Sequence, residues 1–466
     1  MVLSEGGCQV KVGIIGAGPA GLAAARELVQ ANCEIVIFDS NAQSGGQYWR
    51  HQKNTEFPEK KFSDISRDSR IQWHFHASVW QIENLDPGFR IHYSGEGSSS
   101  SIEVEKILIA TGASERTLPF KNWTSPGVMT AGAAQTMAKV HRLLPGSSIL
   151  IAGSGVFAMP VAKSLITLAG DNGITIELGI IEARSLIRWW RNIPGFILNP
   201  GKVIEALGYL AFAKRNRIKR ISRSVVTEAV VKDGQLSGVR VARLNREMKI
   251  VGDSYLLPCD ALATSFGFTP DMTIPSIMGV HRVFRNSDAV VDVDENQRTS
   301  VIDVWAAGEV TGIGGHELSI TEGRIAALNI AGVRGGVRLA LARWKRLRQR
   351  IFADGLSRIY PIDSNWISWQ EDSVVVCRCE EVTLKEIVDS VNHLGADSAR
   401  SAKLFTRAGM GLCQGRFCQR NVQDITERCT KFSGVDGLEE RTSVKDANRE
   451  TVRPIGGVVT LGELSD

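Results

Sequence analysis

Short apolar runs alternate with helical patterns along the first two-thirds of the chain, and two of these runs lead directly into glycine-rich turns. Residues 11–15 form a β-rich run that is followed by G-A-G-P-A-G at residues 16–21. Residues 147–152 repeat this pattern before G-S-G-V-F-A at residues 153–158. Strands that alternate with helices predict parallel sheets. We therefore expect an α/β fold with two Rossmann-like dinucleotide-binding domains.

In the first turn each glycine has a separate expected role. Gly16 permits the tight turn, Gly18 lets the backbone approach a pyrophosphate, and Gly21 allows close helix packing. The following helix offers free N–H groups to negative phosphates at its N-terminus. The next strand, residues 34–38, ends in Asp39, which is placed to accept hydrogen bonds from an adenosine ribose. Glycines, strand and acid in this order predict a dinucleotide site.

The second turn predicts a second nucleotide fold with Gly153 and Gly155 in the loop. Alanine in the third glycine position still permits close packing. The next strand ends at Glu182, which would favour a free ribose hydroxyl, as in NAD. Arg184 lies just behind it and could instead bind the 2′-phosphate of NADP. A nucleotide fold with an empty site, or with a different nucleotide, is the remaining alternative.

Four cysteines near the C-terminus follow the pattern C-R-C, a long spacer and C-Q-G-R-F-C. Short spacers let one tight loop supply two thiolates to the iron atoms of an iron–sulfur cluster. Structural zinc would also accept four thiolates, although its usual spacing is C-x2-C. A disulfide pair would need an oxidising compartment, and chance clustering is the last alternative. The pattern therefore predicts a cluster on these residues: Cys377, Cys379, Cys413 and Cys418.

Composition narrows the class of protein without identifying it. The chain has 466 residues, of which 43% are hydrophobic and 23% charged, as expected for a globular protein of about three domains. A net charge of +5 is mild for this length and does not indicate nucleic-acid binding. No signal peptide or membrane-spanning stretch is predicted. Eight cysteines without a predicted secretion signal indicate a reducing compartment. We therefore expect a cytoplasmic protein, associated with membranes at most through partners.

Two further strands end in short motifs, A-T-G at residues 110–112 and A-G-E at residues 307–309. In this order the motifs of roughly residues 10–335 resemble the two-dinucleotide flavoprotein disulfide reductase superfamily. The resemblance implies FAD in the first site, with Gly112 where the domains join and Gly308 and Glu309 at the flavin ribityl chain. Glu309 replaces the usual aspartate and is one methylene longer. A nicotinamide nucleotide is implied for the second site.

Narrower motifs lie at residues 45–50 (G-G-Q-Y-W-R), 110–133 and 407–416. Together they resemble the larger flavoprotein subunit of heteromeric bacterial amine dehydrogenases, a group with opine oxidases, hydroxyproline dehydrogenases and hydrogen cyanide synthase. The resemblance adds Gln47 to the expected cofactor-binding residues. The cysteine module resembles bacterioferritin-associated ferredoxin, which implies a 2Fe–2S cluster. In such complexes a smaller, amino-acid-oxidase-like partner oxidises the amine, and this larger subunit relays electrons to an acceptor in a hetero-oligomer.

These motifs predict the domain organisation. Residues 1–120 and 285–335 should form a discontinuous FAD domain, residues 121–284 the second nucleotide domain, residues 336–369 a linker helix, residues 370–432 the cluster domain and residues 433–466 a tail. On the linker helix we expect Trp344, Leu347 and Ile351 to pack inward and the arginines to face solvent, or to dock an acidic partner. The insert with Trp189, Trp190, Phe196 and Tyr209 is expected to pack in the core, with a channel lining or an intersubunit contact as the alternatives.

Catalytic acid–base residues are not predicted. His316 follows the A-G-E motif and could transfer a proton, but a packed or solvent-facing role is the simpler interpretation. No C-x2-C or C-x4-C pair lies near either glycine motif, so the redox disulfide of disulfide reductases is missing. We favour the electron-handling subunit of a dehydrogenase for an opine, hydroxyproline or glycine. The alternatives are a stand-alone NAD(P)H-dependent FAD/2Fe–2S reductase and a non-enzymatic relay.

Overall fold

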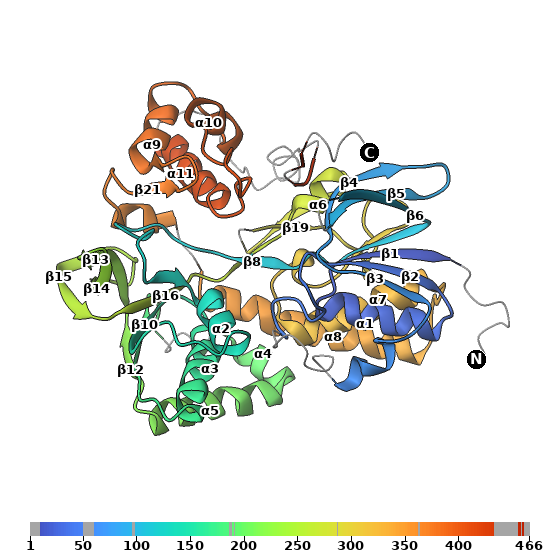
Figure 1. Cartoon of the computed structure of the whole chain (residues 1–466), viewed down its shortest axis with the longest axis horizontal. Helices are drawn as coiled ribbons and strands as arrows, with labels where there is room; N and C mark the ends of the chain where they lie inside the picture. The colour runs from blue at the N-terminus through green and yellow to red at the C-terminus, as the bar shows by residue number, and fades with distance from the viewer. Residues whose placement is uncertain are drawn as a thin grey trace. The chain divides into compact units, whose positions relative to one another are not determined.

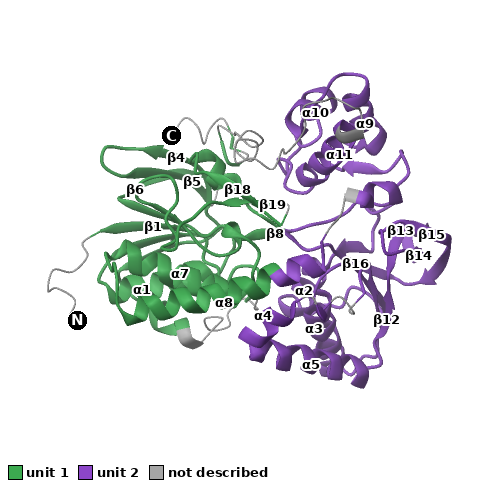
Figure 2. Cartoon of the chain, turned by 180° about the vertical axis from the view of Figure 1, so that it is seen from behind, with its two compact units in different colours: residues 1–114, 269–354, 441–466 green, residues 115–268, 355–440 purple. Residues whose placement is uncertain are grey.

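The computed structural model describes residues 10–49, 60–95, 98–185, 189–190, 192–286, 288–361, 364–432, 455–457 and 459–460. Two compact units form: unit 1 contains residues 1–114, 269–354 and 441–466, and unit 2 contains residues 115–268 and 355–440 (Figure 2). Within the described residues the chain passes between the units in β8 (Ala113–Glu115), in β17 (Phe268–Pro270) and in α8 (Val337–Ile359). The predicted bounds of the FAD, second nucleotide and cluster domains stay a prediction. Most of the predicted tail, residues 433–466, lies outside the described residues.

Unit 1 is built on a five-stranded parallel sheet in the order β20-β7-β1-β2-β3. Figure 1 labels β1, β2 and β3 of this sheet. The central strand β1 pairs Ile14 with Ile37 of β2 and with Leu108 of β7. Its side chains are buried on both faces, which explains the continuous apolar runs in the sequence. The strands are β1 (Lys11–Ile15), β2 (Glu34–Phe38), β3 (Ile71–His74), β7 (Lys106–Ile109) and β20 (Val304–Ala306).

One face of this sheet packs with α1 (Pro19–Gln30), α7 (His316–Ile330) and the 3-10 turn η1 (Lys60–Ile65) in a single hydrophobic cluster. The helices α1 and α7 approach closely, because a Cβ at Gly323 would overlap the carbonyl oxygen of Ala20. The other face packs on an antiparallel sheet and short elements: β4 (Ser78–Asn84), β5 (Phe89–Gly95), β6 (Ser98–Val104), α6 (Thr273–Ile277), β18 (Arg282–Arg285), β19 (Asp288–Val291) and η3 (Glu309–Thr311).

The linker helix α8 spans Val337–Ile359 and ends before the predicted linker segment does, and its expected orientation is wrong. Trp344 and Leu347 are 55% and 58% exposed, whereas Arg350 is buried. The reason lies in α7, where the fully buried carboxylate of Glu322 binds Arg346 and Arg350. The free energy gained by pairing the buried Glu322 carboxylate outweighs the free energy that burial of Trp344 and Leu347 would contribute, because an unpaired buried charge is very costly.

Unit 2 repeats the parallel arrangement in the order β12-β11-β10-β16-β9. The strands are β9 (Val128–Thr130), β10 (Ser148–Gly153), β11 (Glu177–Glu182), β12 (Lys219–Ser222) and β16 (Ala261–Ser265), and α2 (Ala131–Lys139) and α3 (Ala158–Asp171) pack on them. A three-stranded sheet of β13 (Ser224–Lys232), β14 (Gln235–Leu244) and β15 (Ile250–Pro258) follows. Lys232 pairs with Gln235 across β13 and β14, so Asp233 and Gly234 form the hairpin turn between these strands.

The aromatic insert of unit 2 forms α4 (Ile193–Leu198) and α5 (Pro200–Arg215). The expected core packing holds only for part of this insert. Trp189 stacks on Phe196 with ring centroids 5.5 Å apart, and its indole N–H donates to Tyr360 Oη. Trp190, in contrast, is 64% exposed.

The last part of unit 2 is a small helical module that follows the 3-10 turn η4 (Ser364–Trp369). It contains β21 (Val375–Cys377), β22 (Val382–Thr383), α9 (Leu384–Asn392), α10 (Ala399–Thr406) and α11 (Gln419–Phe432). Thr383 and Glu386 cap α9 reciprocally, which explains why the helix begins directly after β22. Trp366, Ile387 and Ile425 are fully buried in the core of this module.

Candidate cofactor sites

The first glycine loop connects β1 to α1 with little room for side chains. A Cβ at Gly16 would overlap the carbonyl oxygen of Ala110, and one at Gly21 would overlap that of Gly16. Gly18 is the N-cap of α1 and provides no side-chain cap, so the first N–H groups of the helix have no capping side chain. This loop therefore has the close backbone and open helix end that a pyrophosphate requires.

Asp39 lies at the end of β2, as predicted, and is buried. Its Oδ2 accepts a hydrogen bond from Ala17 N at 2.7 Å, and its Oδ1 accepts bonds from both nitrogens of Asn41. The carboxylate thus holds the glycine loop in shape, and a ribose hydroxyl would share oxygens that the protein already uses. Gln47 lies beyond this loop with an exposed side chain.

The A-T-G motif follows β7 and the A-G-E motif follows β20, so both lie at the edge of the sheet where β1 ends. Gly112 follows β7, and its carbonyl oxygen accepts a bond from Asp271 N at 3.0 Å. A Cβ at Gly308 would crowd Ala20, so the A-G-E turn lies against the first turn of α1. The Glu309 carboxylate accepts bonds from Gly315 N at 2.6 Å and Gly314 N at 3.3 Å. Burial raises the Glu309 pKa.

Glu322 is a site residue that the sequence interpretation missed. Its Oε2 accepts bonds from Gly308 N at 3.1 Å and Thr311 Oγ1 at 2.8 Å, while Oε1 binds Arg346 and Arg350. Burial alone would raise the Glu322 pKa, but the two guanidinium groups outweigh burial and the pKa is lowered. The available signal was an acid in the middle of a helix whose other residues are mostly apolar or small. Glu322 thereby holds the A-G-E turn in place.

His316 begins α7 and packs against the aromatic pair of the G-G-Q-Y-W-R motif. Its ring stacks on Tyr48 with centroids 3.9 Å apart and an interplanar angle of 13°. Trp49 meets the same ring edge-on at 6.3 Å. This favours the packed role expected for His316.

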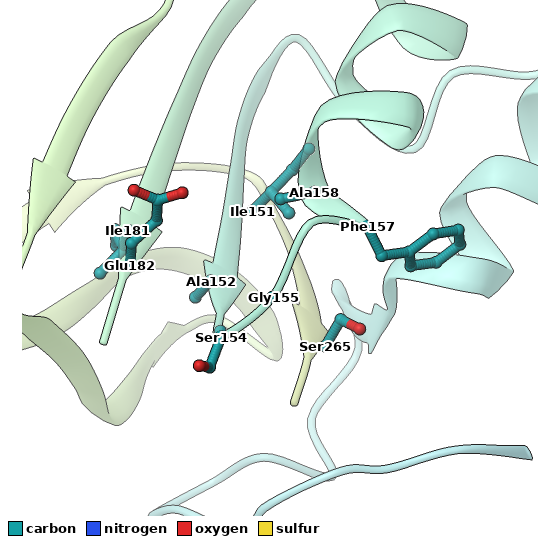
Figure 3. Close-up of a pocket in the computed structure, with 10 residues that line it drawn as sticks. Ile151, Ala152, Ser154, Gly155, Phe157, Ala158, Ile181, Glu182 and Ser265 are labelled. Carbon is teal, nitrogen blue, oxygen red and sulfur yellow. The ribbon is translucent and has the colours of Figure 1, made fainter. Parts of the chain in front are cut away.

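The second glycine loop has the same architecture. A Cβ at Gly153 would overlap the carbonyl oxygen of Ser265, so β10 and β16 come very close there, while the space around Gly155 is open. The loop lines a recess at the ends of three strands. Figure 3 shows Glu182 at the end of β11, Ser154 in the loop after β10, and Ser265 at the end of β16.

Glu182 is buried and forms an ion pair with Arg220 of β12 at 2.6 Å, a partner that the sequence did not suggest. Burial raises the Glu182 pKa, although Arg220 partly offsets this effect. Arg184 donates to the carbonyl oxygen of Pro361 at 3.5 Å. Glu182 lines the recess, where a ribose-binding acid is expected to lie.

Three buried polar atoms at this recess have no hydrogen-bond partner in the described part of the chain. They are Ser154 Oγ, Glu182 Oε2 and Ser265 Oγ. Buried polar atoms are rarely left unpaired in native proteins. Ligand hydroxyl, amide or phosphate groups could satisfy all three, so the residues fit a bound nucleotide.

The four predicted cluster cysteines come together in the C-terminal module. The Cys377 thiol interacts with Cys418, and Cys379 interacts with Cys413. The Cys418 thiol donates to Cys377, which lowers the Cys377 pKa to about 5. Gly409 N also donates to Cys377 Sγ at 3.4 Å. A Cβ at Gly411 would overlap the Cys379 side chain, so glycine is needed there.

The alternatives to a cluster fit these thiols less well. No disulfide forms among the seven cysteines within the described residues. Within the same residues no group of three His, Cys, Asp or Glu side chains is arranged to hold a single metal ion. Two thiol pairs that are near one another suit two bridged irons, which spread their ligands over a larger span than one ion does.

The cluster module is anchored in unit 2 through Asp424 of α11. This buried carboxylate accepts hydrogen bonds from Trp366 Nε1 at 2.9 Å and Arg420 Nε at 3.1 Å, and it pairs with Arg116. Asn421 Nδ2 donates to the carbonyl oxygen of Thr117 at 2.9 Å. Helix α11 begins just after Cys418, so this network fixes the segment that carries the last two cysteines.

Fold and site together define a flavoprotein oxidoreductase with two dinucleotide-binding domains and a ferredoxin-like module. Residues 10–335 match the model of the pyridine nucleotide-disulphide oxidoreductase family, and residues 375–428 match the BFD-like [2Fe-2S] binding domain. The chain belongs to the pyridine nucleotide-disulphide oxidoreductase family. Its cofactors are FAD, a nicotinamide nucleotide and a 2Fe–2S cluster. The predicted α/β fold and cofactors are thereby confirmed.

Relatives resemble the chain over almost its whole length. The A subunit of opine oxidase from Agrobacterium tumefaciens is 29% identical, over 93% of this chain and 89% of the relative. The corresponding opine oxidase subunit from Rhizobium meliloti is 30% identical, over 91% and 83%. Hydrogen cyanide synthase subunit HcnB of Pseudomonas aeruginosa is 30% identical, over 92% and 95%. The predicted resemblance to subunits of this kind is confirmed.

Solved structures support the fold. L-proline dehydrogenase from P. horikoshii matches with a TM-score of 0.68 at 19% identity, over 98% of this chain and 79% of that one. Thioredoxin reductase from T. acidophilum matches with a TM-score of 0.52 at 20% identity, over 70% and 98%. Among the described residues, no helix is long and apolar enough to cross a membrane.

Proposed function

We propose that this chain is the electron-transferring flavoprotein subunit of a heteromeric dehydrogenase that oxidises an amine of the opine, hydroxyproline or glycine type. The observation that carries the proposal is the likeness to HcnB and to the A subunit of opine oxidase across both the nucleotide fold and the cysteine module. These relatives are named as subunits of larger enzymes. A catalytic, amino-acid-oxidase-like partner would complete the enzyme here.

The residues of this chain fit the role of an electron relay. Bound flavin accepts electron pairs and releases single electrons, and a 2Fe–2S cluster transfers single electrons. In unit 1 we assign flavin binding to Gly16, Gly18, Gly21, Asp39, Gln47, Gly112, Gly308 and Glu309. The cluster ligands would be Cys377, Cys379, Cys413 and Cys418. Oxidation of an amine to an imine releases two electrons and two protons, and the partner would carry out that step.

One observation favours a second candidate, a self-contained NAD(P)H-dependent reductase. The recess at Gly153, Gly155 and Glu182 has unpaired polar atoms that suit a nucleotide. In that case the nicotinamide nucleotide would be the electron donor. The two candidates thus differ in the source of the electrons.

An anaerobic absorbance spectrum of the isolated chain, before and after addition of NADH or NADPH, separates these candidates. We expect the flavin and cluster bands to persist with either nucleotide and to bleach with dithionite. Rapid bleaching by a nicotinamide nucleotide would contradict the proposal and support the self-contained reductase.

The cluster assignment has its own test in the Cys413→Ser variant. We expect loss of iron and inorganic sulfide while the flavin is retained, because Cys413 is remote in sequence from the flavin loop. Cys429→Ser is the matched control, since Cys429 lies in α11 outside the four-cysteine set. Unchanged iron and sulfide content in Cys413→Ser would reject the ligand assignment.

A further inference from the structure

Two consecutive helices of unit 2 expose many large apolar side chains. Ile197 of α4 and Ile204 of α5 are 72% and 73% exposed. Helix α5 lies on the outside of unit 2 (Figure 2). We call this surface the α4–α5 face; its exposed residues are Trp190, Ile193, Ile197, Val203, Ile204, Leu207 and Leu210. Exposed apolar patches of this kind mark binding surfaces.

Helix α5 is apolar on two opposite sides. On the inner side Ala213 is buried and Phe212 packs against the core of unit 2. On the outer side Val203, Leu207 and Leu210 follow one another at spacings of four and three residues. A surface helix normally keeps its outer side polar. We therefore expect a second apolar environment, outside the core of unit 2, to cover the outer side of α5.

Basic residues continue this outer side. Lys214 lies four residues after Leu210 on the same side of α5, and Arg215 is next to it. Arg217 and Lys219 follow, and all four side chains are exposed. The acid in α5 is Glu205, which pairs with Lys202 at 2.9 Å. The α4–α5 face thus combines an uncharged apolar centre with a strongly positive end.

We infer that the α4–α5 face binds the surface of an anionic lipid bilayer. Apolar side chains such as Ile204 and Leu207 would enter the boundary between headgroups and acyl chains, and the basic end would contact lipid phosphates. Trp190 suits this boundary, because an indole ring has an apolar body and one polar N–H group.

Two features favour a lipid surface over a protein. A specific protein interface makes about one hydrogen bond per 100–200 Å². From residue 203 to residue 211 the outer side of α5 consists of Val203, Ile204, Leu207, Gly208, Leu210 and Ala211, while helical periodicity places the polar residues of this stretch, Glu205 and Tyr209, on the opposite side. The exposed basic residues at the end of α5 also match the negative charge of an anionic lipid surface, which attracts basic segments next to an apolar face.

Co-sedimentation of the full, cofactor-loaded chain with vesicles tests this inference. The probes are vesicles of phosphatidylcholine mixed with phosphatidylglycerol, and vesicles of phosphatidylcholine alone. We expect binding to the anionic vesicles and at least about a tenfold loss of partitioning in the double variant Ile204→Glu/Leu207→Glu, given the apolar area withdrawn. The double variant Val251→Glu/Leu256→Glu is the matched control, since it changes exposed apolar residues of β15.

A second pair of measurements tests the charge contribution. Each of Lys214→Ala and Arg215→Ala is expected to weaken binding to anionic vesicles about fivefold, and added salt should reduce the difference. Equal partitioning of the Ile204→Glu/Leu207→Glu variant and its control would overturn the inference. The absence of binding to anionic vesicles would also overturn the inference. Self-association that depends on Ile204 and Leu207, measured by sedimentation, would then assign the face to a second copy of the chain.

Discussion

The two glycine-loop sites share an architecture but differ in how their acids are bonded. In unit 1 both oxygens of Asp39 accept hydrogen bonds from the protein, and so do both oxygens of Glu322. In unit 2 Glu182 has one oxygen paired with Arg220 and the other without a partner in the described residues. The first site is held in shape by the protein's own bonds. The second would become fully bonded when a ligand is present.

This difference explains how one fold serves two kinds of nucleotide site. A site with satisfied acids is preorganised, so its geometry should persist in the absence of cofactor. A site with unpaired buried groups bears a desolvation cost until a ligand satisfies them. Ligand binding should therefore raise the free energy of unfolding of unit 2 in two ways: through the contacts of the ligand itself and through the new partners that it gives to the unpaired buried groups. The following substitutions test the contrast in order of expected effect.

Removal of the Glu322 carboxylate should have the largest effect. Glu322→Ala leaves Arg346 and Arg350 without their buried partner and frees Gly308 N, so we expect a loss of about 3–5 kcal/mol in the free energy of unfolding. Denaturant unfolding measures this loss, and flavin content reports on the A-G-E turn. Glu27→Ala is the control, because the arginines that pair with Glu27, Arg324 and Arg338, are themselves largely exposed. Similar losses in the two variants would contradict preorganisation by Glu322.

Steric closure of the second loop should have the next effect. Gly153→Ala places a Cβ onto the Ser265 carbonyl oxygen, so we expect about 1–3 kcal/mol of destabilisation and loss of nucleotide binding. Gly155→Ala is the matched variant: Gly155 also has a positive φ, but the space around the new Cβ is open. Calorimetric titration with NAD and NADP measures binding. Equal behaviour of the two variants would show that backbone strain, rather than the close approach to β16, determines the site.

Much of this contrast could be predicted from local sequence, and some of it could not. Both glycine loops, the acids at the strand ends and the four cysteines follow local patterns, because each depends on a strand, a turn and a helix start. The partners of those acids do not follow from such patterns. Arg220 reaches Glu182 from the neighbouring strand, and Arg350 reaches Glu322 from another helix, so only the tertiary fold pairs them.

The same reason explains the wrong prediction for the face of α8. Helical periodicity places Trp344 and Leu347 inward, and this orientation is expected when no neighbouring element places a buried charge against the helix. The buried acid of α7 changes the outcome, because it requires Arg346 and Arg350 on the inner side. Periodicity records where apolar residues lie along the helix. It does not record a charge on a neighbouring element.

The pH dependence of stability should distinguish the two acids with a smaller effect. The Glu322 pKa is lowered, so the stability it contributes is present above its ordinary value of 4.5 and is lost as the pH falls. The Glu182 pKa is raised, mainly by burial, so its contribution is present below 4.5 and is lost as the pH rises through the folded-state pKa. The two acids therefore give slopes of opposite sign.

Glu182→Gln should remove the second slope and separate stability from binding. Without ligand the variant is expected to lose the decline in melting temperature that Glu182 causes as the pH rises above 4.5, because no charge is left to bury. Its amide still offers an oxygen to a ribose hydroxyl but loses the charged acceptor, so we expect nucleotide binding to weaken about tenfold. Glu177→Gln is the control, since Glu177 begins the same strand and is exposed. A Glu182→Gln variant with unchanged pH slope and unchanged nucleotide affinity would mean that Arg220 already satisfies this acid, and the contrast between the two sites would then reduce to the two unpaired serine hydroxyls.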